Sequence, residues 1–545
     1  MRLYQGFLLE ELLKDLFELL QHLFAALKSI LKDTDESTHF PDINPEIAAM
    51  ELGGKEMLAI DVFSMSIKGL VEDFMNHLRK TGVDFLSISD IKWVLTVPAI
   101  WGERAKQFMR KSAVKAGIPD ENLLIALEPE CASVYCQYLR SEQMLGAENG
   151  FKPSEKGCSY MVVDIGGGTV DIAVHEKLQG QHLKELCRAT GGDCGGTSVD
   201  NVFIEMLKQL FGDKITSEFK NNDPESYLLL IRSFEVVKRT IKPSTTGKIN
   251  IQIPYVPLSE FCRLNHNKSM EDLVSSSALR SNVSIYKGHM RIEAEYFRGL
   301  FVPTLKTLNS VISKTFQDER ITKVDTIVLV GGFSECALVQ DSIKSAFPSK
   351  RVIVPEECGL AVLKGAVMYG HKPSYISTRI IPFTFGIRVA KPYDGALGHD
   401  RDHIFVHNGK EYSKDLFHVI LECDSEVHVD TKIIKEFSTR RPLQNFIRIR
   451  MYMTKRKDPV YIDEEHCSFI GKAVIRITHP TKALKKVRVV FKFGNTEINV
   501  EAEDEDKDDK YEGLIDFLAN DNEPEPDDGD LEIDIGTPDI LLDEW

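Results

Sequence analysis

The 545-residue sequence lacks any long run of apolar residues. Its Leu-rich beginning is interrupted by charged residues such as Glu10, Lys14 and Glu18, which argues against a signal peptide or a membrane-spanning helix. The ten cysteines form no Cys-x-x-Cys pair and no Cys/His group at zinc spacing. We therefore expect a cytoplasmic protein with buried free thiols, without a membrane span, a disulfide framework or a zinc finger.

A concentration of basic residues is also missing. The formal net charge is −16, and residues 501–545 hold 20 Asp and Glu against 2 Lys, a charge of −18 that leaves +2 for the rest of the chain. A nearly neutral body has no electrostatic footprint for nucleic acid, so we expect no nucleic-acid binding. We predict that residues 503–545 form a disordered acidic tail that is able to bind a basic partner.

The length of the chain requires two or more domains. Apolar residues recur at helical spacing between Leu9 and Leu27, which predicts an amphipathic helix. Further along, helix and strand patterns alternate, with a strand at 92–97 and a helix at 103–116. Residues 1–377 are therefore predicted to form an α/β domain.

The pattern of apolar residues changes after about residue 377. Short runs of alternating apolar residues follow, at 446–453, 473–478, 487–493 and 497–500. Gly494 and Asn495 supply turn chemistry between the last two runs. These patterns predict a separate β-sandwich over residues 378–502.

A glycine-rich hairpin over residues 160–175 is the most informative pattern. Gly166, Gly167 and Gly168 join two β-type runs, and neither a Lys-Ser/Thr pair nor a helix follows, which excludes a Walker loop and a dinucleotide fingerprint. Glycines let backbone N–H groups approach an anion, Thr169 adds a hydroxyl, and Asp164 is placed to hold Mg²⁺ through water. The alternative is a purely structural turn.

Two further glycine-rich turns strengthen the interpretation of the hairpin as part of an anion site. Gly331 and Gly332 lie between a predicted strand at 325–330 and a helix that begins near Glu335, an arrangement typical of anion sites at helix N-termini. A plain connection between strand and helix is the alternative. The segment 191–196, which ends in Gly195 and Gly196, offers more backbone amides.

Charged residues accompany these turns. On the predicted helix 224–241, Glu235, Lys238 and Arg239 share one face, which could clamp a ribose and base or could be a solvated stripe. Glu128 follows the apolar run 123–127, at a strand end, where it could order the water on a metal or the attacking water. Capping of a helix at 131–139 is the alternative for Glu128.

In content and order these blocks resemble the heat-shock 70 kDa protein family. The matching blocks are Thr96-Val-Pro-Ala99, Leu127-Glu-Pro-Glu130, Val163-Asp-Ile-Gly-Gly-Gly-Thr-Val-Asp171, Gly195-Gly196, the helix with Glu235, Lys238 and Arg239, Leu329-Val-Gly-Gly332 and Gly365-Ala366. Val97-Pro-Ala-Ile-Trp101 and Ala105-Lys-Gln-Phe-Met-Arg110 are most similar to the atypical heat shock 70 kDa protein 12 branch. The resemblance implies the ATPase fold shared with actin, built from ribonuclease H-like lobes, and a peptide-binding β domain.

The resemblance also implies roles for residues, with ATP or ADP and Mg²⁺ as cofactors and protein or peptide clients and co-chaperones as partners. Glu128, Asp164 and Asp171 would be the catalytic group that holds Mg²⁺ and orders water. The remaining implied positions are the phosphate contacts Gly166, Gly167, Gly168, Thr169, Gly195 and Gly196, the adenosine contacts Glu235, Lys238 and Arg239, the pocket glycines Gly331 and Gly332, and Pro98 for signalling between domains.

The sequence departs from this family in several places. Nothing in residues 1–90 matches the family's first phosphate loop, of Asp-x-Gly-Thr-Thr type, or its catalytic lysine, so an N-terminally incomplete domain is expected. Glu335 stands where the family has an arginine that stacks on the base, and Lys242 where it has a serine. Residues 371–379 lack the acidic-apolar linker, and the long helical lid is missing. Electrostatic catalysis should therefore be severely reduced.

Three functional hypotheses follow. The first is a divergent, chaperone-type ATP-binding protein of the stress-response kind with at most weak ATPase activity. The second is a pseudo-ATPase that serves as a scaffold or signalling module. The third, a sugar or acetate kinase on the same fold, is disfavoured because such an enzyme has no evident use for the β domain.

Overall fold

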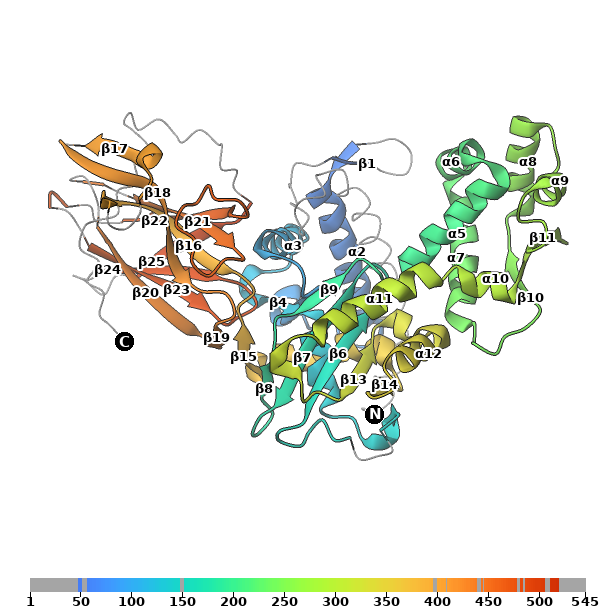
Figure 1. The fold of residues 1–545 in the computed structure, drawn as a ribbon, viewed down its shortest axis with the longest axis horizontal. Helices are drawn as coiled ribbons and strands as arrows, with labels where there is room; N and C mark the ends of the chain where they lie inside the picture. The colour runs from blue at the N-terminus through green and yellow to red at the C-terminus, as the bar shows by residue number, and fades with distance from the viewer. Residues whose placement is uncertain are drawn as a thin grey trace.

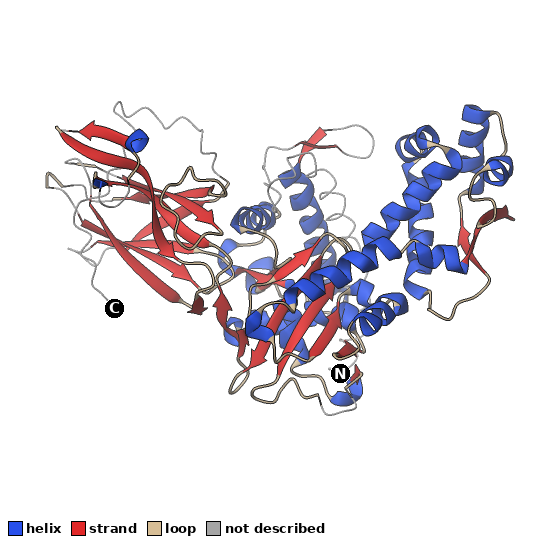
Figure 2. Cartoon of the chain, in the orientation of Figure 1, coloured by secondary structure: helices blue, strands red, loops and turns tan. Residues whose placement is uncertain are grey.

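The computed structural model describes residues 48–50, 56–147, 151–395, 399–407, 409–438, 443–444, 446–477, 481–483, 486–504 and 510–518. The amphipathic helix predicted between Leu9 and Leu27 lies outside these residues. A central α/β body carries a largely helical arm on one side and a β domain on the other (Figure 1). Strands and helices alternate in the body, whereas the β domain contains strands and only short helical turns (Figure 2).

The body contains a small sheet of two parallel strands, β3 (Trp93–Val97) and β4 (Leu123–Leu127). Side chains alternate between its faces, as strand geometry requires. Helices cover both faces, α2 (Ala59–Lys80) and α3 (Glu103–Lys115) on one and α4 (Glu128–Cys136) and α13 (Ala361–His371) on the other. A short hairpin, β1 (Ala48–Met50) and β2 (Glu56–Leu58), precedes α2. The predicted strands at 92–97 and 123–127 and the helix at 103–116 are thus confirmed to within a residue.

A larger sheet forms the centre of the body. Its strands lie in the order β19 (Glu426–His428), β15 (Ile376–Ile380), β8 (Leu183–Glu185), β7 (Val170–Lys177), β6 (Ser159–Ile165), β13 (Thr326–Val330), β14 (Arg351–Pro355) and β5 (Met144–Leu145), with β9 (Thr190–Gly192) paired to β7. β13 runs parallel to β6 and β14. Every residue of β13 is buried, as expected of a parallel strand with both faces covered.

The arm consists of helices together with a small antiparallel sheet. Its helices are α5 (Gly196–Phe211), α6 (Asp213–Asn222), α7 (Pro224–Thr240), α8 (Tyr255–His266), α9 (Met270–Ser276) and α10 (Ala294–Gly299), and its strands are β10 (Lys248–Gln252), β11 (Val283–Tyr286) and β12 (His289–Glu293). α11 (Val302–Thr315) and α12 (Ala337–Ala346) return the chain to the large sheet. Phe203 of α5 and Phe234 of α7 stack with ring centroids 4.0 Å apart, which fixes α7 against α5.

The C-terminal domain consists of antiparallel strands. Their hydrogen-bonded order is β17 (Ile404–His407), β18 (Lys410–Leu421), β16 (Thr384–Pro392), β21 (Phe446–Thr454), β22 (Ser468–Arg476), β25 (Lys510–Asp516), β24 (Asn499–Asp504), β23 (Lys486–Phe493) and β20 (Thr431–Ser438). Apolar side chains of this domain form one core cluster. The described strands are joined in a single path, so the division into two packed sheets stays a prediction.

The predicted boundaries need correction at both ends of this domain. β15 crosses the proposed boundary at residue 377 and belongs to the large sheet, because it pairs with β8 and β19. β25 lies inside the segment 503–545 that was predicted to be a disordered tail. That prediction is wrong for residues 510–516, because their backbone pairs with β22 on one side and β24 on the other. Residues 519–545 lie outside the described part of the chain.

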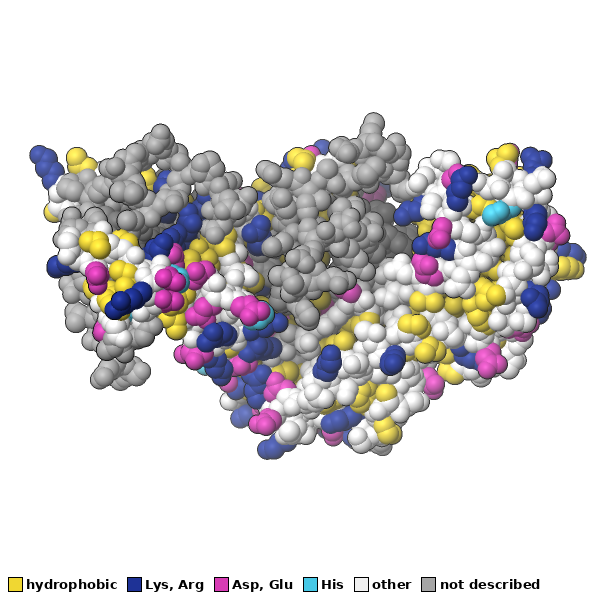
Figure 3. Space-filling model, turned by 45° about the horizontal axis from the view of Figure 1, so that its top comes forward, with side chains coloured by type: hydrophobic (Ala, Val, Ile, Leu, Met, Phe, Trp, Pro, Cys, Tyr) yellow, Lys and Arg dark blue, Asp and Glu magenta, His cyan; other side chains and the backbone are white. Residues whose placement is uncertain are grey.

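The C-terminal domain is docked on the body through α3. Arg110 makes a two-fold ion pair with Glu497, with N–O distances of 2.9 and 2.6 Å, and Lys106 donates to the carbonyl of Thr496 at 2.8 Å. The Gln107 side chain bonds the backbone of Ile515 and Phe517. Charged side chains of both signs gather near this junction (Figure 3).

A buried ion pair lies beneath the docking contacts. Arg379 of β15 donates to both carboxylate oxygens of Glu130 on α4 at 2.7 Å, and it also donates to the carbonyl of Gly494 in the C-terminal domain. Both charged side chains are less than one-tenth exposed. The stretch 371–379, expected to be a linker without the family's coupling sequence, therefore joins the two parts through a strand and a buried charge.

Candidate nucleotide site

The glycine-rich hairpin is confirmed. β6 and β7 are antiparallel, Ile165 faces Val170 across the ladder, and the Gly166 N–H donates to the carbonyl of Thr169 at 3.0 Å. The register also sets Asp164 directly opposite Asp171. Facing residues on adjacent antiparallel strands have Cβ atoms about 5 Å apart, so the two carboxylates share one small region.

The two carboxylates are almost completely buried, with Asp164 5% exposed and Asp171 1% exposed. Burial, and secondarily the charge of Asp171, raise the pKa of Asp164 to about 8. Asp171 is held in place because its Oδ1 accepts the Ile100 N–H at 3.1 Å. Buried paired carboxylates are the hard oxygen donors that suit Mg²⁺, which would neutralise their mutual repulsion.

Gly331 brings the end of β13 against this pair. Its φ of +87° belongs to a region that side chains rarely adopt, and a Cβ there would lie 2.2 Å from Asp164 Oδ1. The following Gly332 begins a short helical turn, η6 (Gly332–Glu335), before α12. The predicted order of strand, glycine pair and helix is confirmed, although a 3-10 turn precedes the α-helix.

The segment 191–196 packs on the hairpin through backbone hydrogen bonds. The Gly196 N–H donates to the carbonyl of Gly166 at 3.0 Å and the Thr197 N–H to that of Gly167 at 2.7 Å. A Cβ on Gly195 would lie 2.6 Å from the Gly167 oxygen. The predicted phosphate contacts Gly195 and Gly196 therefore lie beside the hairpin, and the Gly196 amide already has a hairpin carbonyl as its acceptor.

The structure separates the three charged residues predicted to act together on α7. Lys238 is 2% exposed and donates to Asp200 Oδ1 at 2.6 Å and to the Gly196 carbonyl at 3.0 Å. Arg239 and Glu235 form an ion pair at 3.1 Å, and both side chains are partly buried. Lys238 thus joins α7 to α5, a role that the sequence pattern did not reveal. Its partner Asp200 was missed because no local sequence signal links positions 200 and 238.

The Arg239 guanidinium lies beside the glycine pair. Its Nη2 would be 3.7 Å from a Cβ on Gly332, so this face of α7 reaches the same region as β13. Glu335 lies close by, with Oε1 2.6 Å from the position of a Cβ on Gly359 in the turn η7 (Cys358–Leu360). An acidic side chain therefore stands at this end of the candidate site.

Glu128 and Pro98 sit at the carboxyl ends of β4 and β3. Glu128 is half-buried and is the first residue of α4, so the helix begins three residues earlier than predicted, with Pro129 tolerated in its first turn. Pro98 is buried and opens the turn whose Ile100 N–H bonds Asp171. Within the described residues no three His, Cys, Asp or Glu side chains converge at metal-binding distance, so Asp164 and Asp171 form a pair that Glu128 does not complete.

Comparison with known proteins settles the family. The family model described as Hsp70 protein matches residues 50–414, about two-thirds of the chain. The chain belongs to the Hsp70 family. Its α/β body is an Hsp70-type, actin-like ATPase domain, and the sheet, hairpin and glycine turn described above are the elements that build it.

Within the Hsp70 family, the chain is similar to heat shock 70 kDa proteins 12A and 12B. The 12A protein of Mus musculus is 31% identical over 534 residues, which covers 88% of this chain and 78% of the mouse protein. The 12A protein of Homo sapiens is 31% identical over 533 residues, with the same two coverages. The 12B protein of Homo sapiens is 30% identical over 528 residues and covers 86% of this chain and 76% of that protein. In the described residues, no helix of this Hsp70-family chain is both long enough and apolar enough to cross a bilayer.

Proposed function

We propose that this Hsp70-family chain binds ATP or ADP together with Mg²⁺ at the cluster around Asp164 and Asp171, and that it hydrolyses ATP weakly at most. The observation that carries the proposal is the buried carboxylate pair, in which burial and the charge of Asp171 raise the pKa of Asp164 and Gly331 leaves no room for a side chain. A cation bound between the two carboxylates would relieve this electrostatic cost.

The other residues follow from their positions around this pair. Asp164 and Asp171 hold the cation, and Glu128 at the end of β4 orders a water on it. The amides of Gly167 and Gly168, with Thr169, face the phosphates, whereas Gly166 closes the hairpin through its own hydrogen bond to Thr169 and Gly195 supports the hairpin from beside it. Glu235 and Arg239 contact the nucleoside next to Gly331 and Gly332, whereas Lys238 is assigned a structural role because Asp200 and Gly196 already engage it.

The C-terminal β domain is proposed to contact protein or peptide clients, with co-chaperones as further partners. Family membership supports a client-binding protein, and the edge strand β20 carries Ile434, which is 52% exposed. A cytosolic location is part of the same proposal, supported by the lack of any disulfide among the described cysteines.

A second candidate is a pseudo-ATPase scaffold that keeps the fold without catalysis. It is favoured by the engagement of Lys238 with Asp200 and by the carboxylate of Glu335 beside Gly359. Both features change the charges at the end of the site where the nucleoside would bind, which weakens nucleotide recognition.

Calorimetric titration separates the two candidates. The purified chain is titrated with ADP and with ATP, in Mg²⁺ and in a chelator, beside Asp164→Asn and the exposed control Asp341→Asn on α12. Binding that requires Mg²⁺ and weakens at least tenfold in Asp164→Asn alone supports the nucleotide-binding proposal. No detectable binding in any sample, or binding that Asp164→Asn leaves unchanged, would rule out that proposal and favour the pseudo-ATPase scaffold.

A further inference from the structure

The C-terminal domain places basic side chains on the face of its strands that also carries the apolar core. The strands concerned are β16, β18 and β20 (Figure 1). On β16, Lys391 follows Ile387 and Val389 at alternate positions, and both of these residues are buried in the core cluster. Alternate residues of a strand share a face, so Lys391 lies on the core side at the end of this row.

β18 adds a serine and a histidine to the same face. Ser413 is the register partner of Lys391, and facing residues on adjacent antiparallel strands have Cβ atoms about 5 Å apart. The register then shifts, and Leu416 pairs with Val389, a residue of the core. His418 follows Leu416 at the next alternate position. Ser413, Leu416 and His418 therefore lie on the core side of β18.

β20 supplies a second lysine. Ile433 and Phe437 of this strand pack against the core cluster, whereas Ile434 between them is 52% exposed. Lys435 stands two positions from both packed residues and so shares their face. A lysine in the core-facing row of a strand is unusual, because lysine is among the residues that folding buries least.

The strand path brings β20 back toward β16 and β18. The rings of Phe385 in β16 and Phe493 in β23 have centroids 5.8 Å apart, although these strands are not neighbours in the hydrogen-bonded order, and β23 pairs with β20. The charges of Lys391 and Lys435 both act on His418, and the charge of Lys391 acts on Lys435. Three basic groups from three strands therefore converge at one place.

The polar groups at this place lack the partners that burial normally requires. Ser413 is 0% exposed, and its hydroxyl has no hydrogen-bond partner in the described part of the chain. The same holds for the buried Nε2 of His418. Burial, followed by the charges of Lys391 and Lys435, lowers the pKa of His418 to about 4. Since buried polar groups are nearly always hydrogen-bonded, this cluster has the character of a site that awaits a ligand.

The carboxylates of these strands do not fill that role. Asp415 of β18 forms an ion pair with Arg388 at 2.8 Å. Glu436 is exposed and directly follows Lys435, so it lies on the outer face of β20. A core-facing lysine on an edge strand can also serve to block pairing with other chains. That role would account for Lys435, but it leaves the unbonded hydroxyl of Ser413 without an explanation.

We propose that Lys391, Ser413, His418 and Lys435 form a binding site for a doubly charged oxyanion, either inorganic phosphate or the phosphate group of a small monoester. The two ammonium groups balance the two negative charges, while the hydroxyl and an imidazole N–H donate to the oxygens. Lys391 is exposed, so the site is open to solvent at this end of β16.

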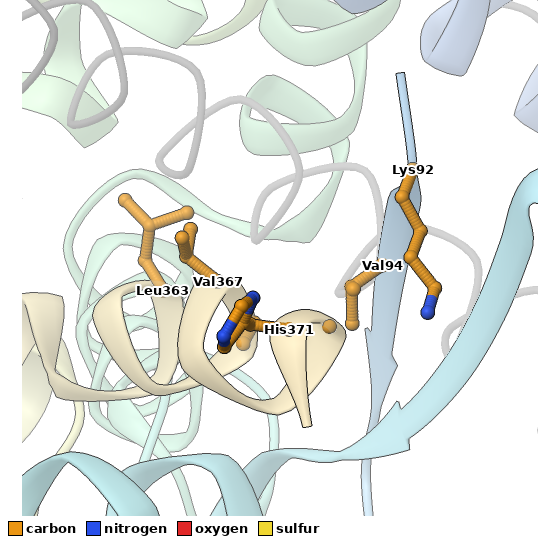
Figure 4. Close-up of a pocket in the computed structure, with 7 residues that line it drawn as sticks. Lys92, Val94, Leu363, Val367 and His371 are labelled. Atoms are coloured by element: carbon orange, nitrogen blue, oxygen red, sulfur yellow. The ribbon is translucent and has the colours of Figure 1, made fainter. Parts of the chain in front are cut away.

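Another place with basic side chains provides a control. A cavity of about 440 Å³ between β3 and α13 is lined by Lys92 and His371 together with the apolar Val94, Leu363 and Val367 (Figure 4). Lys92 and His371 are both exposed, so water can hydrate their polar groups. Lys92→Met therefore removes a positive charge outside the proposed anion site.

Equilibrium dialysis of the full-length chain against labelled inorganic phosphate tests this proposal. The experiment is done at constant ionic strength in a chelator, which removes the cation that the proposed nucleotide site requires. We expect saturable binding that weakens by about tenfold or more in Lys435→Met, because a charge-assisted bond is lost. Lys432→Met, an exposed position of the same strand, and Lys92→Met should bind phosphate like the wild type.

A stability measurement shows whether Lys435→Met is still folded. This variant removes a partly buried charge, so without phosphate it should unfold at the same denaturant concentration as the wild type or at a higher one. Methyl phosphate distinguishes the two sources of the anion. Binding as tight as that of inorganic phosphate indicates a monoester ligand, whereas weaker binding indicates the free anion.

Two results would overturn the proposal. If the wild type shows no saturable binding, or chloride competes as well as phosphate, the cluster is not a phosphate site. If Lys435→Met and Lys432→Met bind phosphate equally, the anion is held elsewhere. The test uses neither nucleotide nor Mg²⁺, so its outcome is independent of the proposed function.

Discussion

The two sheets of the body differ in completeness. The large sheet surrounds β6 and β13 with neighbours on both sides and buries the carboxylates of Asp164 and Asp171, whereas the small sheet leaves one side of β3 without a described partner. Keeping two buried carboxylates close together costs electrostatic free energy, and such an arrangement persists only where the surrounding backbone is fixed. The proposed cation and nucleotide site thus rests on the large sheet, while α3 beside the small sheet and β15 of the large sheet hold the C-terminal domain.

The largest effect on stability is expected at the buried ion pair of Arg379 and Glu130, which joins β15 of the large sheet to α4 beside the small sheet. Arg379→Ala removes the partner of the buried Glu130 and leaves an uncompensated charge, so it should lower the free energy of unfolding by about 3 to 5 kcal/mol. Lys152→Ala, at the exposed pair with Glu155, should cost less than about 1 kcal/mol. Chemical denaturation measures both. Equal costs would show that the buried pair does not join the two parts.

Gly331 tests the large sheet itself. Gly331→Ala forces a Cβ against Asp164 Oδ1 as well as a strained φ, so we expect a loss of about 2 to 4 kcal/mol in the free energy of unfolding and loss of nucleotide binding. Gly288 has a similar φ of +74° but open space around it. Gly288→Ala therefore measures the backbone strain alone and should lower the free energy of unfolding by about 1 kcal/mol. If the two variants unfold alike, contact with Asp164 contributes nothing.

The two neighbouring cations of α7 should separate stability from binding. Lys238→Met leaves the buried Asp200 without its partner and should cost about 2 kcal/mol in the free energy of unfolding. Arg239→Met should cost less than about 0.5 kcal/mol and instead weaken nucleotide binding severalfold, because this side chain lies beside Gly332. Denaturation and titration of both variants check this. The reverse pattern would contradict the assignment.

A smaller effect should appear in the dependence of stability on pH. Burial raises the pKa of Glu185 to about 8, so the folded state keeps a proton that the unfolded state loses near pH 4.5. Stability should therefore fall as pH rises from 5 to 8, by about 1 kcal/mol per pH unit from this group. Glu185→Gln should reduce the measured slope by about this amount and leave the contribution of Asp164, whereas Glu176→Gln on β7 should leave the slope unchanged. An unchanged slope would show that Glu185 is ionised in the fold.

Local patterns in the sequence predicted much of this architecture, because they act over a few residues. The run Leu123–Leu127 is a strand with the predicted bounds, and the glycines after Ile165 form a hairpin because no helix-forming segment follows them. The start of α4 was placed too late because Pro129 reads as a break, although a proline fits a first helical turn.

Long-range partners could not be predicted in this way. Arg379 and Glu130 are 249 positions apart in the sequence, and Lys238 and Asp200 are 38 positions apart, so neither ion pair leaves a local sequence signal. β25 was missed because acidic composition, averaged over the tail, hides a short strand whose hydrogen bonds come from β22 and β24. Composition predicts solvation of a segment, while pairing depends on the edges that the fold offers.

If the large sheet binds a magnesium nucleotide without supporting efficient phosphoryl transfer, as proposed, binding and hydrolysis can be separated by experiment. The most direct test measures ATP binding and single-turnover hydrolysis in one sample of wild-type chain, with and without Mg²⁺, beside Asp164→Asn. We predict saturable, Mg²⁺-dependent binding that Asp164→Asn weakens at least tenfold, with hydrolysis slow even at saturation. Absence of binding, or binding indifferent to both Mg²⁺ and Asp164, would contradict the account.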